Sequence, residues 1–439
     1  MVASLCKARL AGNRPPATDC QLPFGYSIPT KNLFDCNFKV SMKNKKSASH
    51  SSNILYVSVD FFKQNAISIR SNALVKALVE AQFRVDVLTY CRHKHLGNSY
   101  SEKAHFIRAI SIHFGKHKAA RFFSEIINGI FLSICIASKR KNYSLVILSS
   151  PPFFTNAICS RFCRLCKIPY LLDIRDRYPQ VLVDLEILDC NSKLYRLFRY
   201  MERKLYEEAS MLVCVTSKQA KNIQIDYRIN PILVRNGFDE RLFSKKSVTT
   251  IFQEESPSPL TMRIVCHGLF GELFDEISFL ELVQKCVVRV PSVRFVLVGY
   301  GPKLKLLGKL CLHNVEIYGH MSQESVIRLL QKCHIGLSMH TEKSHEVFPV
   351  KIYEFIGASL PCIIFPRNDA GIEVESKNLG WAFNRSSIDK CVALIHQVSQ
   401  NPDKSLEPHL TSLKKHRDAY SRQRQVLRFV QLVRELKGG

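Results

Sequence analysis

Acidic residues are scarce in this sequence of 439 residues, and no long apolar run is present. The chain holds 37 Asp and Glu against 63 Lys and Arg, a formal net charge of +26. This balance predicts an anionic partner, which is a nucleic acid, an anionic membrane surface or a phosphate-bearing substrate. No stretch reaches the roughly 20 apolar residues that a membrane-spanning helix needs. Glycine and proline are not enriched and 46% of the residues are hydrophobic, so we expect a globular chain of two domains.

The cysteines are scattered, and many lie inside apolar runs such as "MLVCVTS". This usage is typical of buried thiols in a reducing compartment. One cluster, Cys159, Cys163 and Cys166, has the C-x3-C-x2-C spacing with which radical-SAM enzymes hold an iron–sulfur cluster. The same spacing also places three residues on one face of a helix. We favour core packing, because the segment lies between strand-like runs where a helix is expected.

Two segments bear on the membrane question. Residues 1–50 are expected to be a disordered leader or a mis-annotated start, because residues 1–41 contain no apolar core of signal-peptide length. Residues 126–138, "IINGIFLSICIAS", form the most apolar segment and have basic residues on both sides. They predict either a buried helix with charged ends or a helix that lies on an anionic membrane surface. The sequence favours neither interpretation.

Short apolar runs alternate with segments of helical length from residue 53 onward. Fully apolar runs rich in β-branched residues predict parallel strands that are covered on both faces. The pattern stops in a polar stretch with two prolines and then starts again, which predicts two doubly wound α/β domains in tandem. We expect a Rossmann-like domain over 51–240, a linker over 241–261, a second Rossmann-like domain over 262–408, and a C-terminal helical segment over 409–439 that crosses back to the first domain. The strand-like runs are "ILYVSVDFF", "RVDVLTY", "SLVILSS", "PYLLDIR", "MLVCVTS", "MRIVCHG", "VRFVLVG", "VEIYG", "IGLSMH" and "PCIIFP".

Glycines follow two of the strand-like runs in the second half. Gly268 and Gly271 in "CHGLFGELFDE" come between a strand and a helix, where backbone N–H groups and a helix N-terminus could approach a phosphate; a simple tight turn is the equal alternative. Gly299 and Gly301 in "VLVGYGP" give a second strand–turn–helix junction. This junction does not match an NAD fingerprint, because the third glycine and the acidic residue at the end of the next strand are missing.

Two glutamates eight positions apart occur in "HEVFPVKIYEF". Pro349 suits the first turn of a helix, so Glu346 is expected in the preceding loop and Glu354 inside the helix. A carboxylate there can accept hydrogen bonds from the two hydroxyls of a ribose, while Lys351 and the start of the helix at Val350 face a diphosphate. Solvated glutamates on a helix surface are the general alternative.

With these motifs in order, the chain resembles the retaining glycosyltransferases of family 4, also called glycosyltransferase group 1, which have the two-domain GT-B fold. The resemblance rests on "EVFPVKIYEFIGASLPCII", "FVLVGYGP", "NVEIYGHMSQESVIRLLQKCHIGLS", "LVRNGFDERLF" and "IPYLLDIRDRYPQVL", and it covers about residues 53–435. At "PVKIYEF" and "DIRDRYP" the chain is similar to the branch that works on bacterial surface polysaccharides.

The resemblance implies that the first domain binds the acceptor and the second binds a nucleotide-sugar in the cleft between them. Glu354 would hold the ribose, and Glu346 would face the sugar and support the positive charge that develops at its anomeric carbon. The other donor-binding candidates are Val350, Lys351, Gly268, Gly271, Gly299 and Gly301. The sequence contains no D-x-D motif, so we expect a metal-independent enzyme without a cofactor, in which helix dipoles, amides and a cation stabilise the leaving diphosphate.

The chain also departs from the family pattern. Members commonly place an Arg and a Lys after the first strand of the second domain, and "GLFGELFDEIS" has neither. The first βα loop, "VDFFKQNAISIR", has no paired glycines. Arg70 at its end is an acceptor-side candidate together with Arg175. Asp176 is a catalytic candidate beside Glu346, whereas an ion pair that orders the loop is the equal alternative for Asp173. The family mechanism is front-side attack, so no general base is named.

The sequence therefore predicts a retaining hexosyl- or N-acetylhexosaminyl-type glycosyltransferase (EC 2.4) that uses a UDP- or GDP-linked sugar. The expected acceptor is a lipid-linked or cell-envelope glycan. The expected location is cytoplasmic and peripheral, on the inner face of the cytoplasmic membrane, because lipid diphosphates and anionic lipids would attract the excess positive charge. The alternative is a non-catalytic, membrane-associated binding or assembly subunit of the same fold. Nucleic-acid binding rests on charge alone and is not expected.

Overall fold

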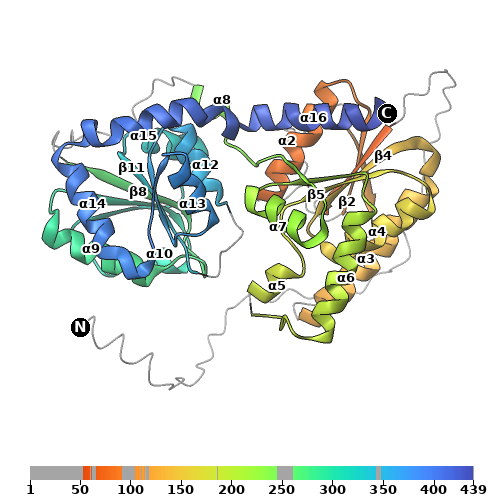
Figure 1. Cartoon of the computed structure of the whole chain (residues 1–439), viewed down its shortest axis with the longest axis horizontal. Coiled ribbons are helices and arrows are strands. Elements are labelled where there is room, and N and C mark those ends of the chain that lie inside the picture. Colours follow the sequence, from red (N-terminus) through yellow and green to blue (C-terminus); the bar gives the residue numbers. More distant parts are fainter. Residues whose placement is uncertain are drawn as a thin grey trace, which may run out of the picture. The chain divides into compact units, whose positions relative to one another are not determined.

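The computed structural model describes residues 53–59, 61, 66–90, 104–109, 111–112, 114, 118–184, 186–244, 261–342 and 348–438. The expected leader, most of the expected linker and the catalytic candidate Glu346 lie outside these residues. Two parallel sheets with helices around them belong to one compact unit that spans Ser51–Gly439 (Figure 1). The expected α/β class with two doubly wound parallel sheets is confirmed.

The first sheet has seven strands in the order β3-β2-β1-β4-β5-β6-β7, and all of its pairs are parallel. Five of these strands coincide with predicted apolar runs. The strands are β1 (Asn53–Val57), β2 (Val85–Tyr90), β3 (His105–Ala109), β4 (Tyr143–Ser150), β5 (Tyr170–Ile174), β6 (Met211–Cys214) and β7 (Ile232–Leu233). The helices are α2 (Ala66–Glu80), α3 (Lys118–Ser138), α4 (Phe153–Leu165), α5 (Gln180–Asp184), α6 (Lys193–Glu207), α7 (Ser217–Tyr227) and α8 (Glu240–Ser244).

The second sheet has six parallel strands in the order β10-β9-β8-β11-β12-β13. Its strands are β8 (Arg263–Leu269), β9 (Arg294–Tyr300), β10 (Val315–Tyr318), β11 (Ile335–Met339), β12 (Cys362–Phe365) and β13 (Gly380–Ala382). Its helices are α9 (Glu276–Arg289), α10 (Pro302–Gly308), α11 (Gln323–Leu330), α12 (Val350–Gly357), α13 (Asp369–Ser376), α14 (Ile388–Gln400) and α15 (Pro402–His416).

Helices bury both faces of each sheet, which explains why the strands are apolar throughout. In the first domain, α3, α4, α6 and α7 pack on one face and α2 packs on the other. In the second domain, α9, α10 and α14 cover one face, while α11, α12 and α13 cover the other. Each face of each sheet therefore has its own apolar core. The helices cover the faces of the sheets, and the carboxyl ends of the strands lead into loops.

The last helix, α16 (Arg422–Gly438), returns from the second domain to the first. Its residues Phe429 and Val433 are fully buried in the same core as Leu74 and Leu78 of α2. Figure 1 shows α16 alongside α2. The chain thus passes between the domains twice, once after β7 and once before α16.

The most apolar segment of the sequence lies in α3, and the helix is buried on one side only. Leu132 and Ile136 are fully buried, whereas Phe123, Ile130 and Ile134 are exposed. None of the described helices combines the length and the apolar character needed to cross a membrane. The cysteine cluster follows the helical spacing in α4, where Cys159 and Cys163 are fully buried in the core. Among the described residues, no group of three or more His, Cys, Asp and Glu side chains is arranged to hold a metal ion.

Candidate functional site

The strand order of the second sheet reverses between β8 and β11, and ligands of open parallel sheets bind at such switch points, beyond the carboxyl ends of the strands. Three polar side chains meet there. His267 lies near the end of β8, His340 directly follows β11, and Glu354 projects from α12. The sequence predicts Glu354 alone; the two histidines are found only in the structure.

Glu354 is held between His267 and α11. Its Oε1 accepts a hydrogen bond of 3.2 Å from Nε2 of Gln323, the first residue of α11. Its Oε2 lies 3.4 Å from Nε2 of His267. Burial raises the pKa of the Glu354 carboxyl, and the hydrogen bond from Gln323 opposes that rise. The carboxylate is therefore partly desolvated and strongly disposed to accept hydrogen bonds from a ligand.

The imidazole of His267, next to this carboxylate, and that of His340, at the end of β11, are both neutral at pH 7. Burial, reinforced by the charge of Lys351, lowers the pKa of His267 to about 3 and that of His340 to about 3. Nε2 of His340 is buried and has no hydrogen-bond partner within the described residues, whereas Nε2 of His267 is buried and faces the Glu354 carboxylate at 3.4 Å. Buried polar atoms without partners are rare in folded proteins and indicate a missing ligand or water.

Lys351 and the start of α12 supply positive charge to the same place. Lys351 has no hydrogen-bond or ion-pair partner in the described part of the chain, although it is close enough to the two histidines to lower their pKa values. The helix begins at Val350, directly after its N-cap residue Pro349, whose side chain makes no capping hydrogen bond. Open N–H groups at a helix N-terminus, next to an unpaired ammonium, form a site for an anion.

Gly268 and Gly299 are paired near the ends of β8 and β9, and Gly271 and Gly301 lie in the turns that follow these strands. Gly268, Gly299 and Gly301 all have positive φ angles, of +112°, +145° and +134°. A Cβ atom on Gly299 would come within 1.9 Å of the carbonyl oxygen of Gly268, and one on Gly301 would come within 2.5 Å of the carbonyl oxygen of Phe270. A Cβ on Gly268 would meet nothing within 4 Å. Gly299 and Gly301 thus permit close packing of these segments, whereas open space adjoins Gly268 and a Cβ on Gly271 would contact the Leu269 side chain at 3.4 Å.

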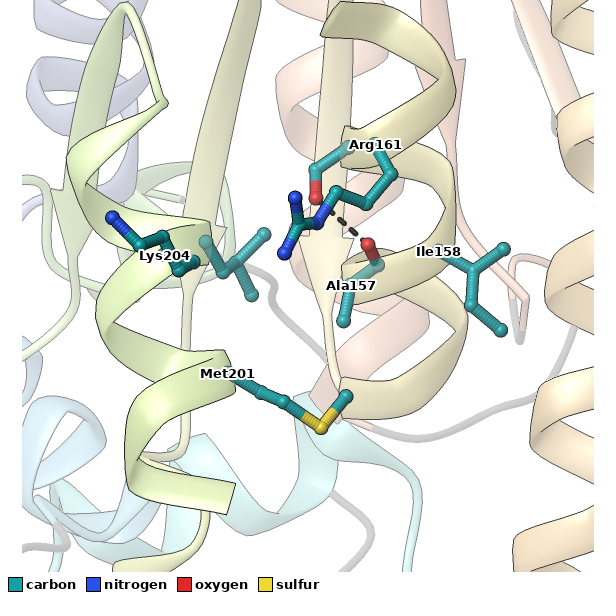
Figure 2. Close-up of a pocket in the computed structure, with 7 residues that line it drawn as sticks. Ala157, Ile158, Arg161, Met201 and Lys204 are labelled. Atoms are coloured by element: carbon teal, nitrogen blue, oxygen red, sulfur yellow. Dashed lines mark hydrogen bonds between the residues drawn. The ribbon is translucent and has the colours of Figure 1, made fainter. Parts of the chain in front are cut away.

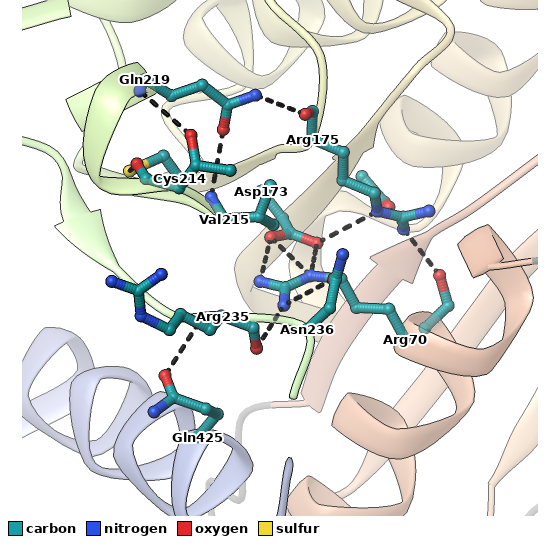
Figure 3. A network of polar contacts seen from close by, with 12 residues as sticks. Arg70, Asp173, Arg175, Cys214, Val215, Gln219, Arg235, Asn236 and Gln425 are labelled. Carbon is teal, nitrogen blue, oxygen red and sulfur yellow. Dashed lines mark hydrogen bonds and ion pairs between the residues drawn. The ribbon is translucent and has the colours of Figure 1, made fainter. Parts of the chain in front are cut away.

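The acceptor-side candidates form a buried network in the first domain (Figure 3). Asp173, at the end of β5, is fully buried and accepts two hydrogen bonds from Arg70 of α2, of 2.7 Å from Nη2 and 3.1 Å from Nε. Burial alone would raise the pKa of the Asp173 carboxyl, but Arg70 and Arg175 together lower it. Arg70 also donates to the carbonyl oxygen of Arg235. This ion pair orders the loops, as the structural alternative for Asp173 predicts, and it occupies much of the Arg70 guanidinium.

Arg175 directly follows β5, and its side chain reaches β4, one of the two strands at the switch point of the first sheet. Its Nη2 donates to Ser71 of α2 and to Ser149 of β4. Nε of Arg175 lies 3.6 Å from Oδ2 of Asp173, and Nη1 is buried without a hydrogen-bond partner among the described residues. Asp176, the next residue, is exposed. Of the acceptor-side candidates, Arg175 therefore retains free hydrogen-bonding capacity where the fold places ligands, and Arg70 largely does not.

Comparison with known families identifies a segment of the second domain. Residues 277–416 match the model of the family described as glycosyl transferases group 1. This segment is a glycosyltransferase group 1 domain. It contains Glu354, Lys351, Gly299 and Gly301, whereas His267 and Gly268 immediately precede it on β8. No curated protein matches the chain at a significant level of sequence similarity.

Solved structures with the same fold match most of the chain, including the part outside the group 1 domain. A sucrose-phosphate synthase from Thermosynechococcus elongatus is similar over 88% of this chain and 99% of its own, with a TM-score of 0.66 and 16% identity. WaaG, a glycosyltransferase involved in lipopolysaccharide biosynthesis, is similar over 88% and 100% (TM-score 0.62, 13% identity). Anabaena HepE in complex with UDP and glucose is similar over 88% and 100% (TM-score 0.59, 13% identity). The expected GT-B fold is confirmed, and the group 1 domain confirms the expected enzyme class, a glycosyltransferase.

Two functional candidates were missed in the sequence. His267 and His340 each stand at the carboxyl end of an apolar strand, in "IVCHG" and "IGLSMH". A polar residue at such a position is the available signal, because strand ends of parallel sheets carry ligand sites.

A cavity of about 200 Å³ lies between α4 and α6 (Figure 2). It is not the functional site, because ligands of parallel sheets bind beyond the carboxyl ends of the strands. Largely apolar side chains of these two helices line it, with Arg161 and Lys204 beside them.

Proposed function

We propose that the chain is a retaining, metal-independent glycosyltransferase of family 4 that transfers a sugar from a nucleoside diphosphate sugar. The observation that carries this proposal is the grouping of Glu354, Lys351, which has no partner among the described residues, and the start of α12 at the switch point of the second sheet. Anabaena HepE, which has the same fold, binds UDP and glucose. A UDP- or GDP-linked sugar is therefore the expected donor.

The chemistry follows from the charges of this site. Glu354 accepts hydrogen bonds from the ribose hydroxyls, while Lys351 and the first N–H groups of α12 stabilise the diphosphate. The bond between the anomeric carbon and the diphosphate oxygen breaks, and the acceptor hydroxyl forms a new bond on the same face of the sugar. The leaving phosphate takes the acceptor proton. Preorganised cations and amides stabilise the charge that develops on the phosphate, so the proposal needs no metal ion and no cofactor. Glu346 stays the predicted partner of the sugar.

The acceptor is proposed to enter from the first domain. The buried Nη1 of Arg175, which has no hydrogen-bond partner among the described residues, would donate to its hydroxyl or phosphate oxygens. The exposed carboxylate of Asp176 is the second candidate for contact with the reacting hydroxyl. Arg70 forms hydrogen bonds with Asp173, so it would not contact the acceptor itself. It would affect acceptor binding only by holding the loop after β5 in place.

We further propose that the acceptor is a lipid-linked or cell-envelope glycan and that the enzyme docks on the anionic inner face of the cytoplasmic membrane. Phe123, Ile130 and Ile134 form an exposed apolar stripe on α3, and the exposed Lys139, Arg140 and Lys141 follow it. In α6 of the same layer, exposed Leu194, Leu197 and Tyr200 alternate with Lys193, Arg196 and Arg203. Apolar side chains among basic ones are typical of surfaces that bind anionic lipid. WaaG, which has the same fold, is involved in lipopolysaccharide biosynthesis.

Nucleotide binding tests the proposal directly. Thermal unfolding would be followed for the native chain and for Glu354→Gln with UDP, GDP, CMP, NAD and S-adenosylmethionine. A nucleoside diphosphate at 100 times its dissociation constant should stabilise the native chain by about 2.7 kcal/mol. Glu354→Gln removes the charge at constant volume and should lose most of this shift, while Glu324→Gln, at an exposed glutamate of α11, should keep it.

The outcomes separate the candidate functions. A shift with one nucleoside diphosphate identifies the base, and transfer from the corresponding sugar nucleotide, with retention of the anomeric configuration, completes the test. Binding without any transfer or donor hydrolysis would favour the non-catalytic binding subunit. If none of the nucleotides stabilises the native chain, the donor site proposed around Glu354 is wrong.

A further inference from the structure

A second cavity, of about 520 Å³, lies between α7 of the first domain and α13 of the second. Its volume is within the range of small-molecule sites. The first turns of α7, which follow β6, form one wall, and one side of α13, which follows β12, forms the other. The cavity therefore adjoins the carboxyl ends of strands from both sheets, where ligands of such folds bind. None of its lining residues is among the donor-site or acceptor-side candidates described above.

Positive charge exceeds negative charge around this cavity. Lys218, Lys221 and Lys377 line it together with Asp369 and Glu373. Each acid is already paired, because Lys218 lies 3.2 Å from Asp369 and Lys377 lies 2.8 Å from Glu373. Lys221 is exposed and has no hydrogen-bond or ion-pair partner within the described ranges. The lining thus has one ammonium group that is free to bind an anion.

Arg235, just behind the wall, adds a buried cation. Its Nη2 lies 2.7 Å from Glu373 and donates a 2.8 Å hydrogen bond to Ser217, and both of these residues line the cavity. The Arg235 side chain is only 6% exposed, and its Nη1 has no hydrogen-bond partner in the part of the chain that is described. Arg235 and Lys377 share one carboxylate. Four cations therefore face two acids, a net charge of +2, and a buried N–H donor remains unsatisfied.

The start of α7 contributes in the same direction. The Thr216 side chain caps the helix by accepting a hydrogen bond of 3.1 Å from the Gln219 N–H. The N–H groups of Ser217 and Lys218 precede this bond and have no acceptor within the helix. These free N–H groups carry the partial positive charge of the helix N-terminus, which adds to the charge of the lysines that line the cavity.

We propose that the α7–α13 cavity binds a phosphate-class anion. Lys221, Lys218, the Ser217 hydroxyl and the first amides of α7 contact it, and Arg235 positions Ser217 and Glu373 behind them. Two sources offer this chemistry: a phosphate group carried by the acceptor, or a free phosphate compound. The first source rests on the proposed function and would make the cavity a specificity site for charged acceptors.

Titration of the full chain with inorganic phosphate tests the site, at constant ionic strength in chloride and with the donor site filled by whichever nucleoside diphosphate stabilises the chain. Lys221→Gln and Lys218→Gln should each weaken phosphate binding about tenfold, because each removes a charge-assisted contact. Lys404→Gln, at an exposed lysine of α15, is the matched control and should bind phosphate as the native chain does. Glu354→Gln should also leave phosphate affinity unchanged, because it alters the donor site only.

The proposal fails if the native chain does not bind phosphate, if Lys221→Gln binds it as tightly as the native chain, or if the loss follows Glu354→Gln instead. If no nucleotide binds but Lys221→Gln still weakens phosphate binding, the anion site stands and the donor function fails. Transfer kinetics then distinguish the sources. A raised KM for the acceptor with an unchanged donor KM in Lys221→Gln identifies an acceptor phosphate, whereas two unchanged KM values identify a free phosphate compound.

Discussion

His267 and His340 are neutral imidazoles whose burial makes folding depend on pH. Their folded pKa values of about 3 lie below the ordinary value of 6.5. Each histidine therefore contributes stability above pH 6.5 that is lost as the pH falls towards 3, because only the unfolded chain takes up the proton. Between pH 7 and pH 5 the loss is about 2 kcal/mol per histidine. In His267→Gln the free energy of unfolding should fall by about 2 kcal/mol less between these pH values than in the native chain.

Urea denaturation of both proteins at both pH values measures this difference. Each protein is compared with itself, so the packing cost of the substitution cancels. His340→Gln should give a similar reduction, because the second imidazole is buried beside the same lysine. An undiminished pH dependence in both variants would contradict neutral burial at this site.

Single residues also show what the sequence could reveal. Glu354 was predicted because it belongs to a spaced pair next to Pro349, and α12 does begin directly after that proline. The Arg70–Asp173 pair joins residues 103 positions apart, so no local spacing could predict that Arg70 is buried. His267 was overlooked because it continues an apolar run, and its contact with Glu354 becomes visible only when β8 and α12 are brought together.

Among the elements, the central strands and the edge strand β10 were predicted, whereas the edge strands β3, β7 and β13 were not. All ten predicted apolar runs contain strands, because burial on both faces leaves a signal in the composition. The outer strand β3 contains His105 and Arg108, and β7 and β13 span two and three residues. Such strands are defined by pairing with a neighbour, and short or polar segments carry little periodic signal.

The ends of β8 and β9 provide a prediction for paired elements. Gly299→Ala places a Cβ atom 1.9 Å from the Gly268 carbonyl oxygen, so one backbone has to move. Gly268→Ala is the matched control, because it has the same unfavourable positive φ but open space for the methyl group. Backbone strain alone should cost about 1–3 kcal/mol in each variant, and Gly299→Ala should lose clearly more stability in urea denaturation. Equal losses would contradict the close contact between the two strand ends.

The whole molecule carries a net charge of +26, and the prediction for it concerns the apolar and basic surface of α3 and α6. The native chain should cosediment with vesicles that contain anionic phospholipid, bind neutral vesicles weakly, and be released by salt, because screening weakens attraction between exposed charges. Replacing both Ile130 and Ile134 with Gln removes apolar area that would enter the lipid interface and should weaken binding about tenfold or more. Val288→Gln with Leu306→Gln, at two exposed apolar residues of the second domain, is the matched control. The surface is wrongly assigned if this control pair loses as much binding as the α3 pair. Membrane docking itself is contradicted if the native chain stays in the supernatant with anionic vesicles at low salt.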